Sequence, residues 1–269
     1  MSTIQSNSER PLWSKLARPS PYWAWSGERL FQQDTSQELV PDARRANPLA
    51  RFMVSHIYGR QNRAGTVRRT IKEAIARLPG NAFGLNFGAG EDQIDPRIIT
   101  LDVKPFRGVD IVSNGSLEIP LADSSLSLII SQEVLEHVRD PHGAVREFHR
   151  TLSPGGELVL QLPFIIGYHP GPEDLWRFST EAYAQLLPAD RWQIVSKEIS
   201  VGHGTGFHRI LTEFTAVHFS VFGNKIYRGA KGAFALLFSP FILFDVLTPF
   251  LPEKDRVPGG YIVVAKALK

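Results

Sequence analysis

The sequence predicts an α/β fold, in which helices cover an open and mostly parallel β-sheet. Short apolar runs recur through residues 84–162, separated by turns and amphipathic stretches at the spacing of strand–helix–strand units. The first run leads into a glycine turn, Gly88-Ala89-Gly90, and the second ends on Asp102. Such a sheet receives a nucleotide-like cofactor at a glycine turn after its first strand, because a backbone without Cβ atoms can approach a ligand closely.

Seven apolar runs are expected to be strands. They are the run before Gly88, Ile98–Asp102, Val109–Val112, Leu126–Ile130, Glu157–Leu162, Trp192–Val201 and Tyr261–Ala267. The segment Val103–Val109 is shorter than the dozen or more residues of a helical crossover, so we expect a compact loop there.

Helices are expected between several of these strands. Thr66–Leu78 and Pro141–Leu152 each place apolar side chains on one face and end near a glycine. Glu133–Val138 is expected to form a short helical turn, and a further helix is expected to begin near Glu181.

The residues around the glycine turn narrow the choice of cofactor. Gln93 replaces the third glycine of a dinucleotide-binding fingerprint, and Glu91 and Asp92 place negative charge beside the turn, which disfavours a phosphate. A cationic cofactor without phosphate suits this turn better, and S-adenosylmethionine, a sulfonium, is such a cofactor. Asp102 is then expected to accept hydrogen bonds from ribose hydroxyls.

An ordered set of motifs resembles the class I S-adenosylmethionine-dependent methyltransferases, and looks most like their small-molecule, type 11 branch. The resemblance covers about residues 81–190 and is carried by Gly84–Gly90, Leu101-Asp102, Ile119-Pro120-Leu121, Ser131–Val138 and Leu152–Gly156. It implies a Rossmann-like, seven-stranded mixed sheet with helices on both faces. The same resemblance implies S-adenosylmethionine as cofactor.

The resemblance also implies a cofactor pocket, formed by Asn86, Gly88, Ala89, Gly90, Asp102, Val103, Asn114, Gly115, Ser131 and Gln132. Asn86 and Asn114 stand where the family often has acids. An Asn oxygen can still accept an N–H bond, although without the assistance of a charge. These two departures leave open the alternative of a non-catalytic cofactor-binding or regulatory protein on a methyltransferase fold.

Two histidines are the candidates for a catalytic base. His137 follows Glu133 by one helical turn, so this carboxylate could orient the ring and raise its pKa. The alternative is a structural His137 that packs or caps beneath the pocket. His169 is the other candidate base.

An aromatic, proline-rich loop follows the fifth strand and is expected to cover the acceptor. Its candidate contacts are Tyr168, Asp174, Trp176 and Arg177. Alternatively, Trp176 and Phe178 are core residues and Arg177 pairs with Asp174. Similar loops occur in methyltransferases that look like tailoring enzymes for sugars, so O-methylation of a saccharide, glycolipid or other small-molecule acceptor is the prediction. A quinone-like hydrophobic molecule is the alternative acceptor.

Several classes of site and partner are disfavoured. The chain has no cysteine, P-loop or clustered Cys/His motif, so no metal site is predicted. Ser131-Gln132-Glu133 differs from the turn with which DNA amino-methyltransferases grip a flipped base, so no nucleic-acid partner is expected. The N-terminus lacks an apolar signal segment, which favours a cytoplasmic location. The sequence does not predict the oligomeric state.

Three regions are expected: an N-terminal arm or helical extension (1–65), a methyltransferase core (66–202 and 259–269), and an apolar helical insert (203–258). The N-terminal region begins with the Pro- and Trp-rich stretch Pro11–Trp25, expected to be a tail or an extended arm, and includes a basic loop at Tyr58–Arg63. The charge is uneven, with 13 basic and 6 acidic side chains in residues 1–80, 9 and 17 in residues 81–200, and 8 and 4 in residues 201–269.

The insert contains the almost wholly apolar segment Phe234–Leu251. Pro240, Asp245 and Pro249 interrupt it, and basic residues flank it. It could bury its apolar face on the core. It could instead lie in the interface of a membrane beside a lipid-linked acceptor, at the cytoplasmic face, and the basic neighbours favour this second reading.

Overall fold

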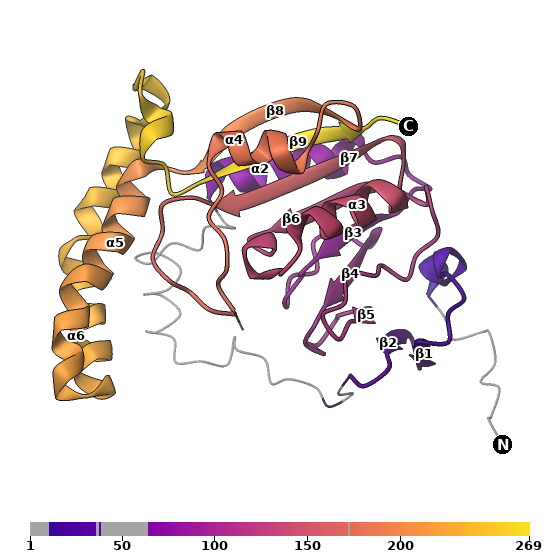
Figure 1. Ribbon diagram of the computed structural model, residues 1–269, viewed down its shortest axis with the longest axis horizontal. Coiled ribbons are helices and arrows are strands. Elements are labelled where there is room, and N and C mark those ends of the chain that lie inside the picture. Colours follow the sequence, from indigo (N-terminus) through magenta and orange to yellow (C-terminus); the bar gives the residue numbers. More distant parts are fainter. Residues whose placement is uncertain (1–10, 36–37, 39–63, 172) are drawn as a thin grey trace.

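The computed structural model describes residues 11–35, 38, 64–171 and 173–269 (Figure 1). They form one nine-stranded sheet in the order β1-β2-β5-β4-β3-β6-β7-β9-β8. The seven predicted strands are all present. They are β3 (Gly84–Phe87), β4 (Ile98–Asp102), β5 (Ile111–Val112), β6 (Leu126–Gln132), β7 (Leu152–Pro163), β8 (Trp192–Val201) and β9 (Gly260–Ala267). Strands β3 to β7 pair in parallel, whereas β9 runs antiparallel between β7 and β8.

Two further strands extend the sheet beyond the predicted seven. The segment expected to be a tail forms a 3-10 helix, η2 (Leu12–Leu16), and the hairpin β1 (Trp23–Ser26) and β2 (Arg29–Gln32). Strand β2 pairs in parallel with β5, and Trp13 and Trp23 are buried. The tail prediction was therefore wrong for this stretch, because large apolar side chains make its burial favourable. The predicted basic loop Tyr58–Arg63 lies outside the described residues.

Helices cover both faces of the sheet, as predicted. Helix α2 (Gly65–Arg77) lies on one face, and α3 (Pro141–Thr151) and α4 (Thr180–Leu186) lie on the other (Figure 1). The alternation of strand side chains explains the two layers, since Leu128 and Ile130 of β6 pack with α2 and the intervening Ile129 faces the α3 side. No helix joins β4 and β5, which confirms the compact loop expected there.

The insert between β8 and β9 is a helical hairpin at one end of the sheet (Figure 1). It consists of α5 (His203–Val217), η7 (His218–Phe222), α6 (Asn224–Leu237), η8 (Ser239–Val246), η9 (Thr248–Phe250) and η10 (Lys254–Arg256). Among the described residues no single helix is long and apolar enough to cross a membrane, but α6 and η8, bent by 43°, pass that test as a pair on length and composition.

Asp245 fastens η8 to the start of α5. Its Oδ1 accepts a hydrogen bond from the Thr205 backbone N–H at 3.0 Å, and its Oδ2 accepts from the Thr205 hydroxyl at 2.5 Å. The first turn of a helix has N–H groups without intrahelical partners, and Asp245 supplies one. The Asp245 carboxylate therefore holds η8 against the first turn of α5.

We expect Asp245→Ala to loosen the hairpin. The substitution leaves the Thr205 N–H and hydroxyl without their acceptor and is expected to cost about 1–3 kcal/mol of stability. Hydrogen exchange should speed up in α5 and η8 but not in α3. The exposed Asp255→Ala, in the same insert, is the control, and equal exchange in both variants would show that apolar contacts alone hold the hairpin.

Candidate active site

The glycine turn lies where β3 ends and is held by β4. The Gly88 and Ala89 N–H groups both donate to the Leu101 carbonyl, at 2.8 and 3.0 Å. Gly88 and Gly90 have φ angles of 74° and 57°, in the left-handed region that favours glycine. A Cβ on Gly88 would lie 2.3 Å from Cγ2 of Val134, whereas a Cβ on Gly90 would meet nothing within 4 Å. Gly88 is thus needed for packing within the protein, and Gly90 presents the open side of the turn to a ligand.

Asp102 joins the turn to the end of β4. Its Oδ2 accepts from the Gly90 N–H at 2.8 Å, and its Oδ1 accepts from the Lys104 N–H at 2.9 Å. Each carboxylate oxygen has more than one acceptor site, so these bonds leave capacity for ribose hydroxyls. Asp102 is therefore suited both to shape the turn and to bind a ligand.

The loop after β5 places Asn114, one of the predicted cofactor contacts, in a local turn. Asn114 is exposed, and its side-chain oxygen accepts from the Ser116 N–H at 3.0 Å, in a local turn. Its backbone N–H donates to Oε1 of Gln32 at 2.9 Å. Sequence reasoning missed Gln32, because no local motif signals that β2 reaches this loop. Gly115 and Val103 are also exposed.

Two polar side chains, Ser131 and Gln132, lie at the end of β6, next to the glycine turn of β3. In the described part of the chain, Ser131 Oγ and Gln132 Oε1 are buried and have no hydrogen-bond partner. Asn86 is buried within β3. Orphaned buried polar atoms call for a partner. Together with the open side of Gly90 they fit a polar, cationic ligand such as S-adenosylmethionine.

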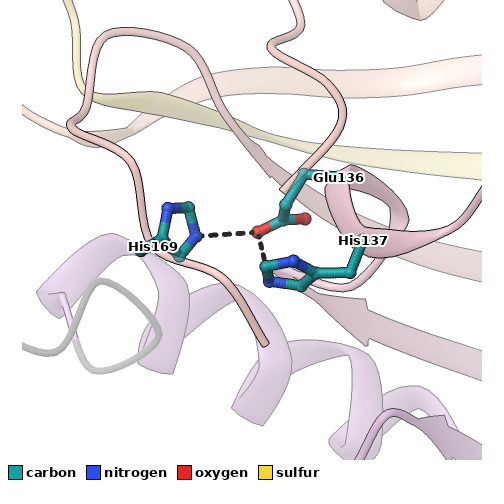
Figure 2. Close-up of side chains that lie close together, drawn as sticks. All are labelled: Glu136, His137 and His169. Carbon is teal, nitrogen blue, oxygen red and sulfur yellow. Dashed lines mark ion pairs between the residues drawn. The ribbon is translucent and has the colours of Figure 1, made fainter. Parts of the chain in front are cut away.

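A second cluster, the Glu–His cluster, consists of Glu136, His137 and His169 (Figure 2). The first two residues lie on η6 (Leu135–His137), and His169 comes from the loop after β7. Oε1 of Glu136 lies 3.7 Å from Nε2 of His137 and 3.5 Å from Nε2 of His169. Glu136 is fully buried, and its carboxylate raises the pKa of His169 against the opposing effect of burial.

The prediction that Glu133 orients His137 was wrong. η6 is a three-residue 3-10 turn, and Glu133 has a φ of 52°, so the carboxylate that faces His137 is that of Glu136. Burial, with the neighbouring Glu136 charge, raises the pKa of Glu133 to about 8. Glu136 is a site residue that the prediction missed. Its sequence neighbours gave no sign that it would meet His169.

The loop that carries His169 docks on η6. The Leu175 and Trp176 N–H groups donate to the Glu136 carbonyl, at 2.8 and 3.2 Å, and the Trp176 indole N–H donates to the Val138 carbonyl at 2.9 Å. These bonds hold the loop over the Glu–His cluster.

Arg177 and Asp174 brace the same loop. The Arg177 guanidinium donates to both oxygens of the buried Asp174 side chain, at 2.6 and 2.7 Å, and lowers the pKa of Asp174 to about 2. Asp174 also accepts from the His169 N–H at 2.8 Å. The alternative that Arg177 pairs structurally is thus the observed one, and Phe178 is buried. Tyr168 and Trp176 are exposed, so they remain candidates for contact with an acceptor.

Comparisons with known proteins show similarity to methyltransferases over part of the chain. Residues 92–160 match the model of a methyltransferase domain. A probable S-adenosylmethionine-dependent methyltransferase of Mycolicibacterium smegmatis is 30% identical over 116 residues, which are 41% of this chain and 43% of that protein. This part of the chain is therefore similar to S-adenosylmethionine-dependent methyltransferases. The chain thus spans less than half the length of the curated relatives it matches, since a probable S-adenosylmethionine-dependent methyltransferase of Mycobacterium tuberculosis is 33% identical over 23% of each chain.

Solved structures are similar at low identity. Phosphoethanolamine N-methyltransferase 2 of Haemonchus contortus, in complex with S-adenosylmethionine, has a TM-score of 0.47 at 12% identity, over 84% of this chain and 58% of that one. The YcgJ protein of Bacillus subtilis has a TM-score of 0.43 at 15% identity, over 80% and 99%. The methyltransferase domain match includes Asp102, Ser131 and the first two members of the Glu–His cluster, but neither Gly90 nor His169.

We expect Asp102→Ala to weaken binding of S-adenosylmethionine by about 1–3 kcal/mol, because it removes the ribose acceptor and releases the Gly90 N–H. Calorimetric titration of the purified chain measures this affinity. The exposed Asp190→Ala serves as the control. If the two variants bind alike, Asp102 is not part of the cofactor site.

Proposed function

We propose that the chain transfers the methyl group of S-adenosylmethionine to a hydroxyl of a saccharide, a glycolipid or another small-molecule acceptor. The observation that carries this proposal is the Glu–His cluster. It joins η6, which follows β6, to the aromatic loop after β7, whose Tyr168 and Trp176 are exposed. A hydroxyl is a weak nucleophile until its proton is removed, and a histidine can accept that proton as a general base. When bound, S-adenosylmethionine supplies a methyl group activated by its sulfonium.

The residues of the chain divide the work of alignment. Gly90 and Asp102 hold the cofactor, and Tyr168 and Trp176 offer apolar faces to the acceptor. His137 and His169 stand beside the Glu136 carboxylate, which stabilises a positive charge on the His169 ring. Methyl transfer in line depends chiefly on this positioning, since aligned reactants avoid most of the entropic cost of meeting.

A non-catalytic cofactor-binding or regulatory role is the alternative. It is favoured by Asn114, whose side-chain oxygen accepts a hydrogen bond from the Ser116 N–H within its own loop. A quinone-like acceptor is the alternative substrate, because the exposed loop is aromatic.

We expect the chain to bind S-adenosylmethionine and to form S-adenosylhomocysteine with hydroxylated saccharides or glycolipids. Trp176→Ala should raise the acceptor KM about tenfold with unchanged cofactor affinity, since a stacked aromatic contact contributes roughly 1–1.5 kcal/mol. Tyr22→Ala, an exposed aromatic on another part of the protein, is the control. Absence of cofactor binding contradicts the enzymatic proposal. Binding without turnover on saccharides, glycolipids or quinols favours the regulatory alternative.

We also propose that the insert contacts an anionic membrane surface, at the cytoplasmic face, where a lipid-linked acceptor would be available. Large apolar side chains are exposed along it, among them Phe214, Phe222, Leu237, Leu243, Val246 and Phe250. Lys225 and Arg228 on α6 are also exposed. Apolar side chains beside basic ones are typical of helices that lie in a membrane interface.

We expect the chain to sediment with vesicles that contain phosphatidylserine more than with neutral ones. Leu243→Ser, Val246→Ser and Phe250→Ser combined should reduce the bound fraction at least tenfold, because interfacial binding scales with buried apolar area. The matched control replaces Leu12, Tyr22 and Leu268, which are exposed elsewhere. Equal sedimentation of both triple variants contradicts the membrane proposal, and concentration-dependent self-association of the unchanged chain would identify a second copy as the partner.

A further inference from the structure

The atoms that converge in the Glu–His cluster are all of the kind that binds metal. One carboxylate oxygen and two imidazole nitrogens lie within 4.8 Å of one another, from two segments that are distant in sequence (Figure 2). The sequence predicted no metal site, because it contains no cysteine and no clustered histidine motif.

Hydrogen-bond polarity fixes which nitrogen of each ring carries the proton. Nδ1 of His137 faces the carbonyl oxygen of Glu173. Nδ1 of His169 lies 3.2 Å from the carbonyl oxygen of Gly167 and 3.5 Å from a carboxylate oxygen of Asp174. Nη2 of Arg177 is also 3.5 Å from this nitrogen, but it donates at shorter distances to the same Asp174 and Gly167 oxygens, at 2.7 and 3.1 Å. These oxygens only accept hydrogen bonds, so each Nδ1 is the donor in the neutral ring. Both Nε2 atoms are then unprotonated, and each lies within 4 Å of Oε1 of Glu136.

The Glu136 carboxylate donates no hydrogen bond to either ring. Its side chain is fully buried, and neither carboxylate oxygen has a hydrogen-bond partner within the described residues; Nε2 of His169 is likewise buried without one. Two unprotonated imidazole nitrogens and a carboxylate oxygen therefore lie close together without a hydrogen between them. A buried carboxylate in this state requires a positive charge.

Two cations could supply that charge: protons on the rings, or a metal ion. The Nε2 to Oε1 distances of 3.7 and 3.5 Å exceed those of an N–H···O hydrogen bond, about 2.7–3.2 Å. Ligands held at roughly 2.0–2.2 Å from a tetrahedral ion lie about 3.4 Å apart. Bound histidines also direct their other nitrogen to a carbonyl or carboxylate, as both rings do here.

We propose that Glu136, His137 and His169 bind one divalent transition-metal ion. Imidazole ligands favour ions such as Zn²⁺ or Co²⁺ over Mg²⁺ and Ca²⁺, which prefer oxygen ligands. Three protein ligands leave a coordination position open, as in catalytic sites. An acceptor hydroxyl would occupy that position and become more acidic there. This last role rests on the proposed methyl transfer; the binding of the ion does not.

The test uses the full chain, freed of metal with a chelator and titrated with Co²⁺, Zn²⁺ and Mg²⁺. We expect one Co²⁺ per chain with a visible absorption band, displacement of Co²⁺ by Zn²⁺, and no displacement by Mg²⁺. His137→Ala, His169→Ala and Glu136→Gln should each weaken Co²⁺ binding at least 100-fold. His142→Ala, an exposed histidine of α3, is the control and should bind as the unchanged chain does.

Affinity for S-adenosylmethionine, measured on the same variants, reports whether each is folded; His169→Ala, on the surface loop, keeps the test valid if Glu136→Gln fails to fold. Absence of the Co²⁺ band, or equal Co²⁺ binding by all folded variants, overturns the metal proposal. Turnover that persists in chelator with no metal bound overturns it while the proposed function stands. Stoichiometric Co²⁺ binding that depends on the three residues, without turnover on any acceptor, supports the metal site and contradicts the proposed function.

Discussion

The register of three parallel strands determines what meets at the site. Phe87 of β3 pairs with Leu101 of β4 and with Ser131 of β6, so the three strands leave the sheet at one level. Gly88, Asp102 and Gln132 come next in the three strands and therefore lie at the same end of the sheet. A shift of one residue would turn β4 over and remove the Asp102 carboxylate from the Gly90 N–H. The continuous burial of β3 and β4 on both faces makes such a shift costly.

Burial of acidic side chains is the second constraint. Glu136 is fully buried, the Asp174 side chain is almost so, and burial with Glu136 raises the pKa of Glu133 to about 8. Asp174 is compensated by two short hydrogen bonds from Arg177. No comparable donor reaches the Glu136 carboxylate among the described residues. A buried charge without a compensating donor contributes little to the stability of a fold, which favours the chemical role proposed for Glu136.

Much of the fold could be predicted, because local patterns decide it. Strands β4 and β8 have the predicted bounds, since each is a run that ends in a clear turn. The glycine turn after β3 and the position of Asp102 at the end of β4 were predicted in the same way. The hairpin β1–β2 was missed because its strands have four residues each, too few to show a period, and their burial depends on a partner strand some eighty residues later. Glu136 was missed for a similar reason, since its chemistry appears only when the loop after β7 folds back on η6.

The insert and the loop that carries His169 are parts of one mechanical unit. The loop leaves β7 beside the end of the insert, where the Phe164 and Ile165 N–H groups donate to the Gly259 and Pro258 carbonyls at 2.9 and 3.2 Å. Gly206 of α5 packs so closely on the Ile165 carbonyl that a Cβ there would lie 3.1 Å from it. If the insert docks on a lipid surface as proposed, a change in its position would be passed to the loop after β7 through these contacts. Since His169 lies on this loop and Glu136 lies on η6, membrane contact by the insert could alter the distance between the two side chains, and with it the proposed methyl transfer.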